Sequence, residues 1–329
     1  MTNAFTFVML PPQTELTRRW AKRLAETVPG LNLPGLNVIV AEDAETAAAA
    51  IVSADAAFGT LPPELLAKAK KLRWLQAPQA APPAGYYYPE LVAHPVTVTN
   101  FREIFNDHIG AHILAFVLAF ARGLHIYIPQ QLRRVWAKPP EDEGVVALPG
   151  SVALIVGLGG IGAEAARLLS AFGVRVLATD ARRTDRPEHV AELHPADRLE
   201  SLLPRADFVI LTVPHTPATE GLFDAAKFRL MKPTAFFINI GRGMTTKLDD
   251  LVAALDAGDI AGAALDVYEQ EPLPADHPLW GMQNVLLTPH MAGYGPHLNE
   301  RRFQIIQDNC RAFANGQPLR NVVDKAAWF

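Results

Sequence analysis

The stretch SVALIVGLGGIGAEAARLLSAFGVRVLATD, residues Ser151–Asp180, places a helical pattern between two strand-like runs. Val152–Gly157 is apolar or small throughout, as in a buried strand, and Val174–Ala178 repeats that character. Ala163–Phe172, between them, has helical periodicity. The order strand, helix, strand predicts one unit of a parallel α/β sheet.

The turn that enters this helix carries the pattern G-x-G-x-x-G. Gly157 permits the tight turn, Gly159 lets the backbone approach a pyrophosphate, and Gly162 lets helix and strand pack closely. The helix N-terminus would present unpaired N–H groups and positive dipole to the phosphates. A glycine-rich loop without a ligand is the alternative, but the whole unit predicts a dinucleotide site. Its expected phosphate-binding residues are Gly157, Gly159, Gly160, Ile161 and Gly162.

The residues that end the second strand bear on which dinucleotide binds. Asp180 follows Gly162 by 18 residues, where a carboxylate can accept hydrogen bonds from the adenosine ribose. Its charge would repel a 2′-phosphate, so we expect NAD. Arg182 and Arg183 come directly after it and can neutralise such a phosphate, which leaves NADP as the alternative.

Composition excludes several other classes of protein. The 329 residues are 50% hydrophobic, which suits two domains, and the net charge of −4 without a basic run argues against nucleic acid as a partner. Cys310 is the only cysteine, so no internal disulfide forms, and we expect a cytoplasmic protein. Ile109–Ala121, the longest apolar segment, is interrupted by His112 and is too short for a bilayer, so no membrane partner is expected. We predict no metal site.

The first hundred residues alternate strand and helix patterns, which predicts a parallel sheet with helical crossovers. The expected strands are Phe5–Leu10, Asn37–Val40, Ala56–Phe58, Leu72–Leu75 and Val96–Thr99, and the expected helices are Glu15–Thr27, Glu45–Ile51 and Pro63–Lys70. After Asp180 the strands are Asp207–Val213, Ala235–Ile240, Gly262–Val267 and Asn284–Thr288, and the helices are Asp224–Leu230 and Lys247–Ala257. Asn106–Arg122 and Pro296–Asn315 are expected to be long helices.

Because the dinucleotide unit starts in mid-chain, the N-terminal sheet should be a separate domain to which the last helix returns. We predict an α/β chain of two domains, each a parallel sheet flanked by helices. Residues 1–100 and 294–329 would form a flavodoxin-like substrate domain. Residues 101–293 would form a Rossmann domain inserted into it, with a cleft between the two domains.

One segment, Leu124–Gly150, breaks the alternation with four prolines. Its apolar residues, such as Tyr127, Val135 and Trp136, call for burial. We expect an irregular arm that reaches over a neighbour rather than a disordered linker. An arm folded back on its own nucleotide domain is the alternative.

Three strand-end segments supply reactive side chains: N-I-G-R-G at Asn239–Gly243, L-D-V-Y-E-Q-E-P at Leu265–Pro272, and L-T-P-H-M-A-G at Leu287–Gly293. Ligands of open parallel sheets bind beyond the carboxyl ends of the strands. Arg242 can grip a carboxylate with its planar fork, His290 can transfer a proton, and Glu271 can orient that histidine. Taken singly, each could be an ordinary loop or surface residue.

Together these segments resemble the D-isomer-specific 2-hydroxyacid dehydrogenases. The resemblance runs from about residue 100 to residue 293 and returns in Ala314–Val323. It implies that Arg242 binds the substrate carboxylate and keto oxygen, that His290 is the acid/base, and that Glu271 orients His290. It implies cofactor contacts from Asp180, Arg182, Val213, Pro214, Thr219, Ile240 and Asp266, and a two-fold homodimer formed by the arm and the helix before it.

The resemblance also implies that backbone N–H groups of an N-terminal loop, with Ala80 and Ala81, meet the substrate carboxylate. This chain departs from the family there, because Pro82 lacks an N–H and the usual glycine is absent. It also has Gly110-Ala111-His112 where relatives commonly read A-E-H, and we interpret His112 as a packed helix residue.

The implied function is hydride transfer between NAD(H), or NADP(H), and the 2-carbon of a small 2-oxo or D-2-hydroxy acid. The glyoxylate/hydroxypyruvate reductase-like branch is the expected relative. Two alternatives are a non-catalytic NAD(H)-sensing protein of the same fold, like the corepressors of this family, and an interaction protein built around the arm.

Overall fold

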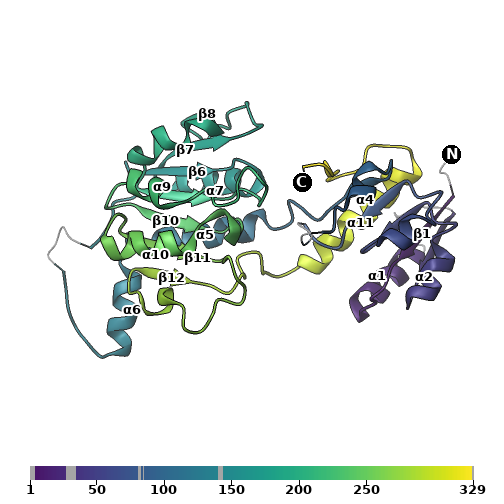
Figure 1. The fold of residues 1–329 in the computed structure, drawn as a ribbon, viewed down its shortest axis with the longest axis horizontal. Coiled ribbons are helices and arrows are strands. Elements are labelled where there is room, and N and C mark those ends of the chain that lie inside the picture. Colours follow the sequence, from purple (N-terminus) through teal and green to yellow (C-terminus); the bar gives the residue numbers. More distant parts are fainter. Residues whose placement is uncertain (1–3, 27–34, 81–82, 84, 140–143, 328–329) are drawn as a thin grey trace. The chain divides into compact units, whose positions relative to one another are not determined.

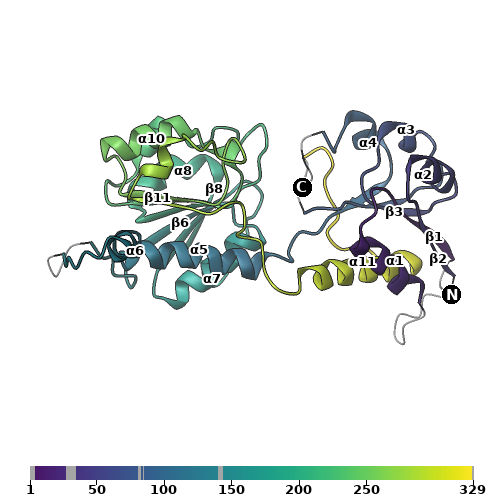
Figure 2. The same cartoon turned by 90° about the horizontal axis from the view of Figure 1, so that it is seen from below.

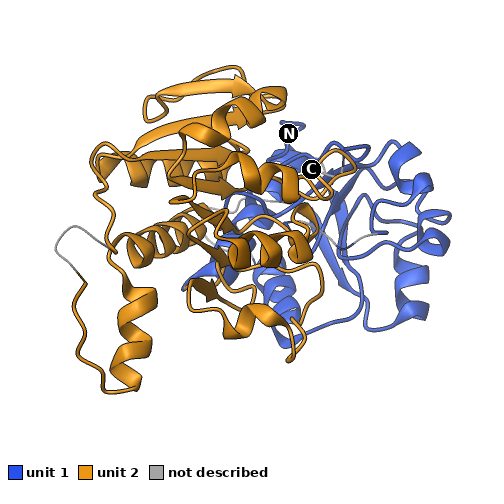
Figure 3. Ribbon diagram, turned by 60° about the vertical axis from the view of Figure 1, so that its left-hand side comes forward, with its two compact units in different colours: residues 1–104, 296–329 blue, residues 105–295 orange. Residues whose placement is uncertain are grey.

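The computed structural model describes residues 4–26, 35–80, 83, 85–139 and 144–327. These residues form two compact units, which Figure 3 shows in two colours: unit 1 is residues 1–104 and 296–329, and unit 2 is residues 105–295. The sequence placed the divisions at 100/101 and 293/294. Ile104 belongs with unit 1 because its carbonyl accepts a hydrogen bond from Arg301 Nη1 at 2.7 Å.

Unit 1 is built on a five-stranded parallel sheet in the order β2-β1-β3-β4-β5 (Figure 1). This is the flavodoxin-like order, so the expected fold of this part is confirmed. The strands are β1 Phe5–Met9, β2 Leu36–Val40, β3 Ala56–Phe58, β4 Trp74–Gln76 and β5 Thr97–Thr99. The helices are α1 Glu15–Ala25, α2 Ala44–Ala50, α3 Pro63–Leu66, α4 Pro89–Ala93 and α11 Leu298–Ala314.

The two faces of this sheet are covered by different helices, with α1 and α11 on one side and α2, α3 and α4 on the other (Figure 2). On the first side the ring of Trp74 lies 5.3 Å from that of Phe7 and 5.7 Å from that of Phe313 in α11. This buried contact explains why the last helix of the chain belongs to the first sheet.

Unit 2 holds a seven-stranded parallel sheet in the order β12-β11-β10-β9-β6-β7-β8. Counted from β6, this is the Rossmann order with a seventh strand added at one edge. The strands are β6 Val152–Val156, β7 Arg175–Asp180, β8 Glu192–Pro195, β9 Phe208–Leu211, β10 Phe236–Asn239, β11 Gly262–Leu265 and β12 Val285–Leu287. The strand order reverses between β6 and β9, and the crevice at such a point is where dinucleotides bind.

Alternation along the strands divides the core of unit 2 into two layers. In β6, Leu154 and Val156 join one buried cluster, while Ala153 and Ile155 join the other. The first cluster includes residues of α8 Leu199–Leu202, α9 Ala225–Leu230 and α10 Leu248–Ala257, and the second includes residues of α5 Asn106–Ala121 and α7 Gly160–Ala171. Figure 2 shows α8 and α10 on one side of the sheet and α5 and α7 on the other.

The expectation of an irregular arm over Leu124–Gly150 is wrong in its first part, because Leu124–Leu132 forms helix α6. Gly123, between α5 and α6, has a φ of +67°, which breaks the helix there and bends the chain. Pro129 lies inside α6, where its ring fits helical φ and removes one backbone donor from a helix of nine residues. Among the described residues, no single helix is long and apolar enough to cross a bilayer; α5 and α6 pass that test only as a pair bent by 73°.

Two of the elements that the sequence did not predict, β8 and α4, carry no clear sequence signal. Strand β8 reads Glu-Leu-His-Pro and owes its extended shape to pairing with β7. Helix α4, which starts at Pro89, has only five residues. Both are too short or too polar for periodicity to show them.

Candidate active site

The loops after β6, β9 and β10 meet around one residue, Val213. A Cβ added to Gly157, after β6, would lie 2.8 Å from Val213 Cγ1, and one added to Gly241, after β10, would lie 2.6 Å from the Val213 carbonyl oxygen. Side chains at either glycine would therefore push these loops apart. The glycines let three strand ends close into one surface beyond the sheet.

The glycine-rich turn leaves the start of α7 open. Gly157 has a φ of +95°, and a Cβ on Gly162 would lie 2.2 Å from the Gly157 carbonyl oxygen, so both positions need glycine. A Cβ on Gly159 would meet nothing within 4 Å, which means that the space above this residue is free. No side chain caps the N-terminus of the twelve-residue α7. The exposed first turn, Gly159 and Gly160 with the half-buried Ile161, thus offers backbone donors to a ligand.

Asp180, at the end of β7, holds the same turn from the other side. Its Oδ2 accepts from the backbone N–H of Leu158 at 2.7 Å, and its Oδ1 accepts from those of Arg182 and Arg183 at 2.8 Å each. Burial acts to raise the pKa of Asp180, but the three donors outweigh it, and its pKa lies below the ordinary value. Arg183 is itself held, since Nη2 lies 2.8 Å from Asp185 Oδ2 and Nη1 donates to the Leu158 carbonyl at 3.1 Å.

The loop after β9 is closed by its own hydroxyl groups. Thr219 Oγ1 donates to the carbonyl of Pro214 at 2.6 Å and accepts from the N–H of Thr216 at 2.8 Å. Of the three residues expected to lie along the cofactor here, Pro214 is exposed, whereas Val213 and Thr219 are half-buried.

Arg242 extends from a turn that fixes its position. A Cβ on Gly243 would lie 1.8 Å from the carbonyl oxygen of Tyr268, so the residue after Arg242 has to be glycine. The fully buried Asn239 donates from Nδ2 to the Arg242 carbonyl at 3.2 Å and accepts from the N–H of Gly241 at 3.0 Å. Burial lowers the pKa of the Arg242 guanidinium, and the nearby Glu271 carboxylate acts in the opposite sense.

His290 and Glu271 form a directly hydrogen-bonded pair. His290 Nδ1 lies 2.7 Å from Glu271 Oε2, and Glu271 Oε1 accepts from the N–H of Tyr268 at 3.0 Å. The side chains of His290 and Glu271 are 49% and 36% exposed, so a small molecule can reach them. Because Nδ1 is engaged, Nε2 is the ring nitrogen left to exchange a proton with a substrate.

The backbone around His290 is strained and is held by Asp266. His290 has a φ of +50°, which costs a non-glycine residue about 1–3 kcal/mol unless its surroundings impose it. The buried Asp266 accepts from the N–H groups of Met291 and Ala292, at 2.8 Å each, and from Thr288 Oγ1 at 2.6 Å. Asp266 was expected to contact the cofactor; in the structure these three donors engage its carboxylate.

Three further residues were expected from the sequence to contact the cofactor or the substrate. Ile240 is 5% exposed and packs in the α5/α7 core layer of unit 2. Ala80 lies in unit 1, where its carbonyl accepts from Asn100 Nδ2 at 2.7 Å. Ala81 is outside the described residues. Their contacts with cofactor or substrate stay predictions.

The sequence missed the residues that build the site rather than react in it. Asn239 is fully buried, and the asparagine that closes the apolar run Phe236–Asn239 is a signal that the sequence does contain. Tyr268 donates from its hydroxyl to the Thr288 carbonyl at 2.9 Å, and no sequence pattern predicts that contact. Within the described ranges, no three histidine, cysteine, aspartate or glutamate side chains are grouped to hold a metal ion.

Comparison with known proteins agrees with this geometry. Residues 114–292 match the family model described as "D-isomer specific 2-hydroxyacid dehydrogenase, NAD binding domain". A glyoxylate reductase of Thermofilum pendens is 35% identical over 241 residues, which cover 72% of this chain and 70% of that protein.

Similar solved structures cover almost the whole chain. A D-isomer specific 2-hydroxyacid dehydrogenase from Xanthobacter autotrophicus, in complex with NADPH and MES, has a TM-score of 0.83 at 27% identity and covers 99% of this chain and 100% of its own. An NADPH-dependent glyoxylate/hydroxypyruvate reductase from Sinorhizobium meliloti, in complex with NADP and sulfate, has a TM-score of 0.80 at 27% identity with the same coverage of 99% and 100%.

Proposed function

The chain belongs to the D-isomer-specific 2-hydroxyacid dehydrogenase family and is an NAD(P)-dependent oxidoreductase, and we propose that it reduces a small 2-oxo acid with His290 as the proton donor. Glyoxylate and hydroxypyruvate are the substrates we propose first. Both are named in relatives, as glyoxylate reductase and as glyoxylate/hydroxypyruvate reductase.

The observation that carries this proposal is the 2.7 Å contact between His290 Nδ1 and Glu271 Oε2. Histidine paired with a carboxylate is a proton-transfer unit, because the carboxylate fixes the tautomer and stabilises the imidazolium. The negative charge of Glu271 acts to raise the pKa of the Arg242 guanidinium. Arg242 follows β10, Glu271 follows β11 and His290 follows β12, and these strands are neighbours in one sheet. A cation that can bind a carboxylate and an acid/base pair therefore lie on neighbouring strand ends.

The turn before α7 fits a dinucleotide. The open space above Gly159 and the uncapped start of α7 suit a pyrophosphate, and Gly162 brings the helix close to the strand. Asp180 would face the adenosine ribose, and its charge favours NAD over NADP in our proposal. When bound, the reduced nicotinamide would supply a hydride for the 2-carbon of the substrate.

The chain's own residues account for the remaining chemistry. Arg242 would bind the substrate carboxylate through its fork and offset charge on the 2-oxygen. His290, protonated, would donate the Nε2 proton to that oxygen, and Glu271 would stabilise the imidazolium until then. The product is the 2-hydroxy acid, and His290 regains a proton from solvent. A contribution from Ala80 and Ala81 to carboxylate binding is part of the same prediction.

A screen of 2-oxo acids tests the proposal. Glyoxylate, hydroxypyruvate, pyruvate and 2-oxoglutarate would be offered with NADH and with NADPH, and cofactor oxidation followed by its absorbance. We expect turnover with glyoxylate or hydroxypyruvate. Cofactor binding without turnover of any 2-oxo acid would contradict the proposed function and restore the sensing alternative.

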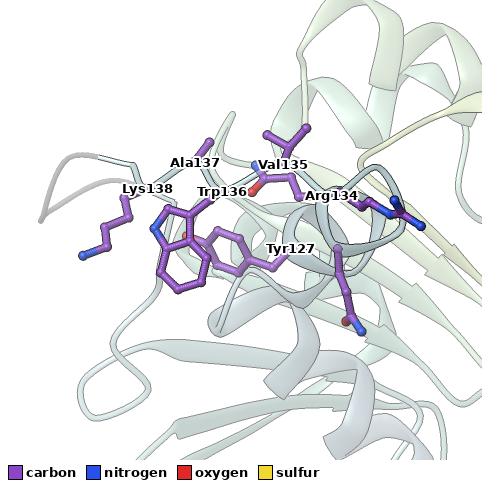
Figure 4. A pocket seen from close by; sticks show the side chains of 8 residues that line it. Tyr127, Arg134, Val135, Trp136, Ala137 and Lys138 are labelled. Carbon is purple, nitrogen blue, oxygen red and sulfur yellow. The ribbon is translucent and has the colours of Figure 1, made fainter.

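We also propose that the protein acts as a homodimer joined through α6 and the segment after it. Six large apolar side chains are exposed there: Leu124, Ile126, Ile128, Leu132, Val135 and Trp136. Trp136 and Tyr127 are among the residues that line a groove of about 510 Å³. Figure 4 shows these lining side chains. An apolar surface of this extent is typical of a contact with another protein chain. The expected cytoplasmic location stays a prediction.

A further inference from the structure

His112 was interpreted from the sequence as a packed helix residue, and the structure shows that it also contacts the His290 loop. It lies in α5, where its ring packs edge-on against Phe116 with 4.5 Å between the ring centroids. Its Nε2 lies 3.1 Å from Thr288 Oγ1, at the end of β12. Thr288 precedes His290 by only two residues.

The donors and acceptors around Thr288 show which atom donates in the contact between His112 and Thr288. The Asp266 carboxylate only accepts hydrogen bonds, so at 2.6 Å the Thr288 hydroxyl is the donor. A hydroxyl has one hydrogen, and the Thr288 oxygen is therefore left as an acceptor toward His112. His112 Nε2 must carry the proton. The chain of donors runs from His112 through Thr288 to Asp266.

The Asp266 carboxylate, where this chain of donors ends, also holds the backbone next to His290. Asp266 also accepts from the N–H groups of Met291 and Ala292, and the Thr288 carbonyl accepts from the N–H of His290 at 3.0 Å. The positive φ of His290 persists only if such contacts impose it. Without the hydrogen bond from His112, the Thr288 side chain would be less well fixed and would hold Asp266 less firmly. The backbone of His290 would then lose part of the constraint that imposes its positive φ.

We propose that His112 is a positioning residue for the reaction, acting through Thr288 and Asp266 on the backbone of His290. The proposal rests on the function proposed above. Burial lowers the pKa of His112, with Asp266 acting in the opposite sense, which suits a neutral ring with one N–H. His112 touches no reacting atom in this scheme.

His112→Met and His112→Gln form the test pair, because glutamine keeps a donor near the Nε2 position and methionine has a similar shape without one. With glyoxylate and the preferred cofactor, His112→Met should lower kcat by roughly 3- to 10-fold, the loss expected for one hydrogen bond. KM and the cofactor Kd should change by less than about twofold. His112→Gln should recover most of kcat. Equal kcat values for the two variants would overturn the proposal.

Further variants separate positioning from stability. His125→Met is the matched control, since His125 also packs edge-on against a phenylalanine, Phe120, but lies in α6; its kcat should equal that of the wild type. Thr288→Val and Thr288→Ser repeat the comparison if His112→Met does not fold. In a His290→Gln background, His112→Met should cause no further loss of kcat, because both act on one proton transfer. An additive loss would overturn the proposal.

The two proposals fail in distinguishable ways. If His290→Gln keeps a normal kcat, the proposed function fails and takes this inference with it. If His290→Gln loses activity while both His112 variants keep it, only the positioning role of His112 is wrong.

Discussion

The strand ends of unit 2 and the exposed segment from α6 to Lys138 use their side chains in opposite ways. At the strand ends, polar groups such as Asp180, Asp266 and Glu271 accept hydrogen bonds from their own loops. In the exposed segment, Trp136 is 91% exposed and Leu132 80% exposed. The first region is preorganised within one chain, and the second leaves an apolar surface to be covered.

Because of this difference, we expect catalysis and assembly to depend on different residues. Substitutions at the strand ends should change chemistry without changing assembly, because each loop is held by contacts within unit 2. Substitutions in the exposed segment should change assembly and leave the His290–Glu271 pair intact.

The largest effect is expected at His290. His290→Gln removes the proton donor, so kcat should fall by about 10²–10⁴ while the cofactor Kd stays within twofold. Steady-state kinetics with glyoxylate and fluorescence titration of NADH measure the two quantities. His194→Gln is the control, because His194 also pairs with a carboxylate, Glu192 at 3.0 Å, in β8. A His290→Gln enzyme with near-normal kcat would remove His290 from the mechanism.

Arg242→Lys should have the next largest effect. Lysine keeps the charge and loses the bidentate fork, and a hydrogen bond to a charged group contributes about 1.5–3 kcal/mol. We expect kcat/KM to fall by roughly 10- to 150-fold, with KM raised and kcat lowered. Arg205→Lys, at a surface ion pair with Glu192, should leave both unchanged. If Arg242→Lys alters only Tm, Arg242 is structural.

Trp136→Glu tests the exposed segment. Burial of one large apolar side chain contributes about 1.5–3 kcal/mol, and a two-fold interface counts it twice. Sedimentation of the wild type should give a dimer of twice 35.8 kDa, and Trp136→Glu should give monomer at micromolar concentration. Val52→Glu, an exposed position in unit 1, should stay dimeric. A monomeric wild type would contradict the proposed assembly.

Asp180→Asn should have the smallest effect, a shift in cofactor preference. The amide oxygen can still accept from the N–H groups of Arg182 and Arg183, whereas the N–H of Leu158 loses its acceptor. The charge that opposes a 2′-phosphate is gone. We expect the ratio of the NADPH Kd to the NADH Kd to fall by roughly fivefold, since one exposed charge contact is worth up to about 1 kcal/mol. A wild type that already prefers NADPH would show that Asp180 does not decide the preference.

The sequence predicted the parts of this molecule that are formed by residues contiguous along the chain. The strand, glycine turn and helix at Val152–Ala171 are contiguous, and their periodicity is visible in one window. Arg242, Glu271 and His290 could be named as candidates because each follows a strand in a recognisable motif, and their catalytic roles stay predictions. The contacts of Thr288 with His112 and Tyr268 join α5, β11 and β12, and no local pattern encodes them. Helix α6 was missed because Pro129 was weighed as a break, although one lost donor is tolerated in so short a helix.

Deuterium transfer follows the hydride itself and therefore tests the dehydrogenase site directly. Purified protein would be mixed with glyoxylate and NADH deuterated at both C4 positions, and the glycolate analysed by mass spectrometry. We predict one deuterium on the 2-carbon of glycolate for the wild type and at least about 100-fold slower transfer for His290→Gln. Bound cofactor with no deuterium in any 2-hydroxy acid, or equal transfer by the two proteins, would contradict the claim that the strand ends of unit 2 form a dehydrogenase site.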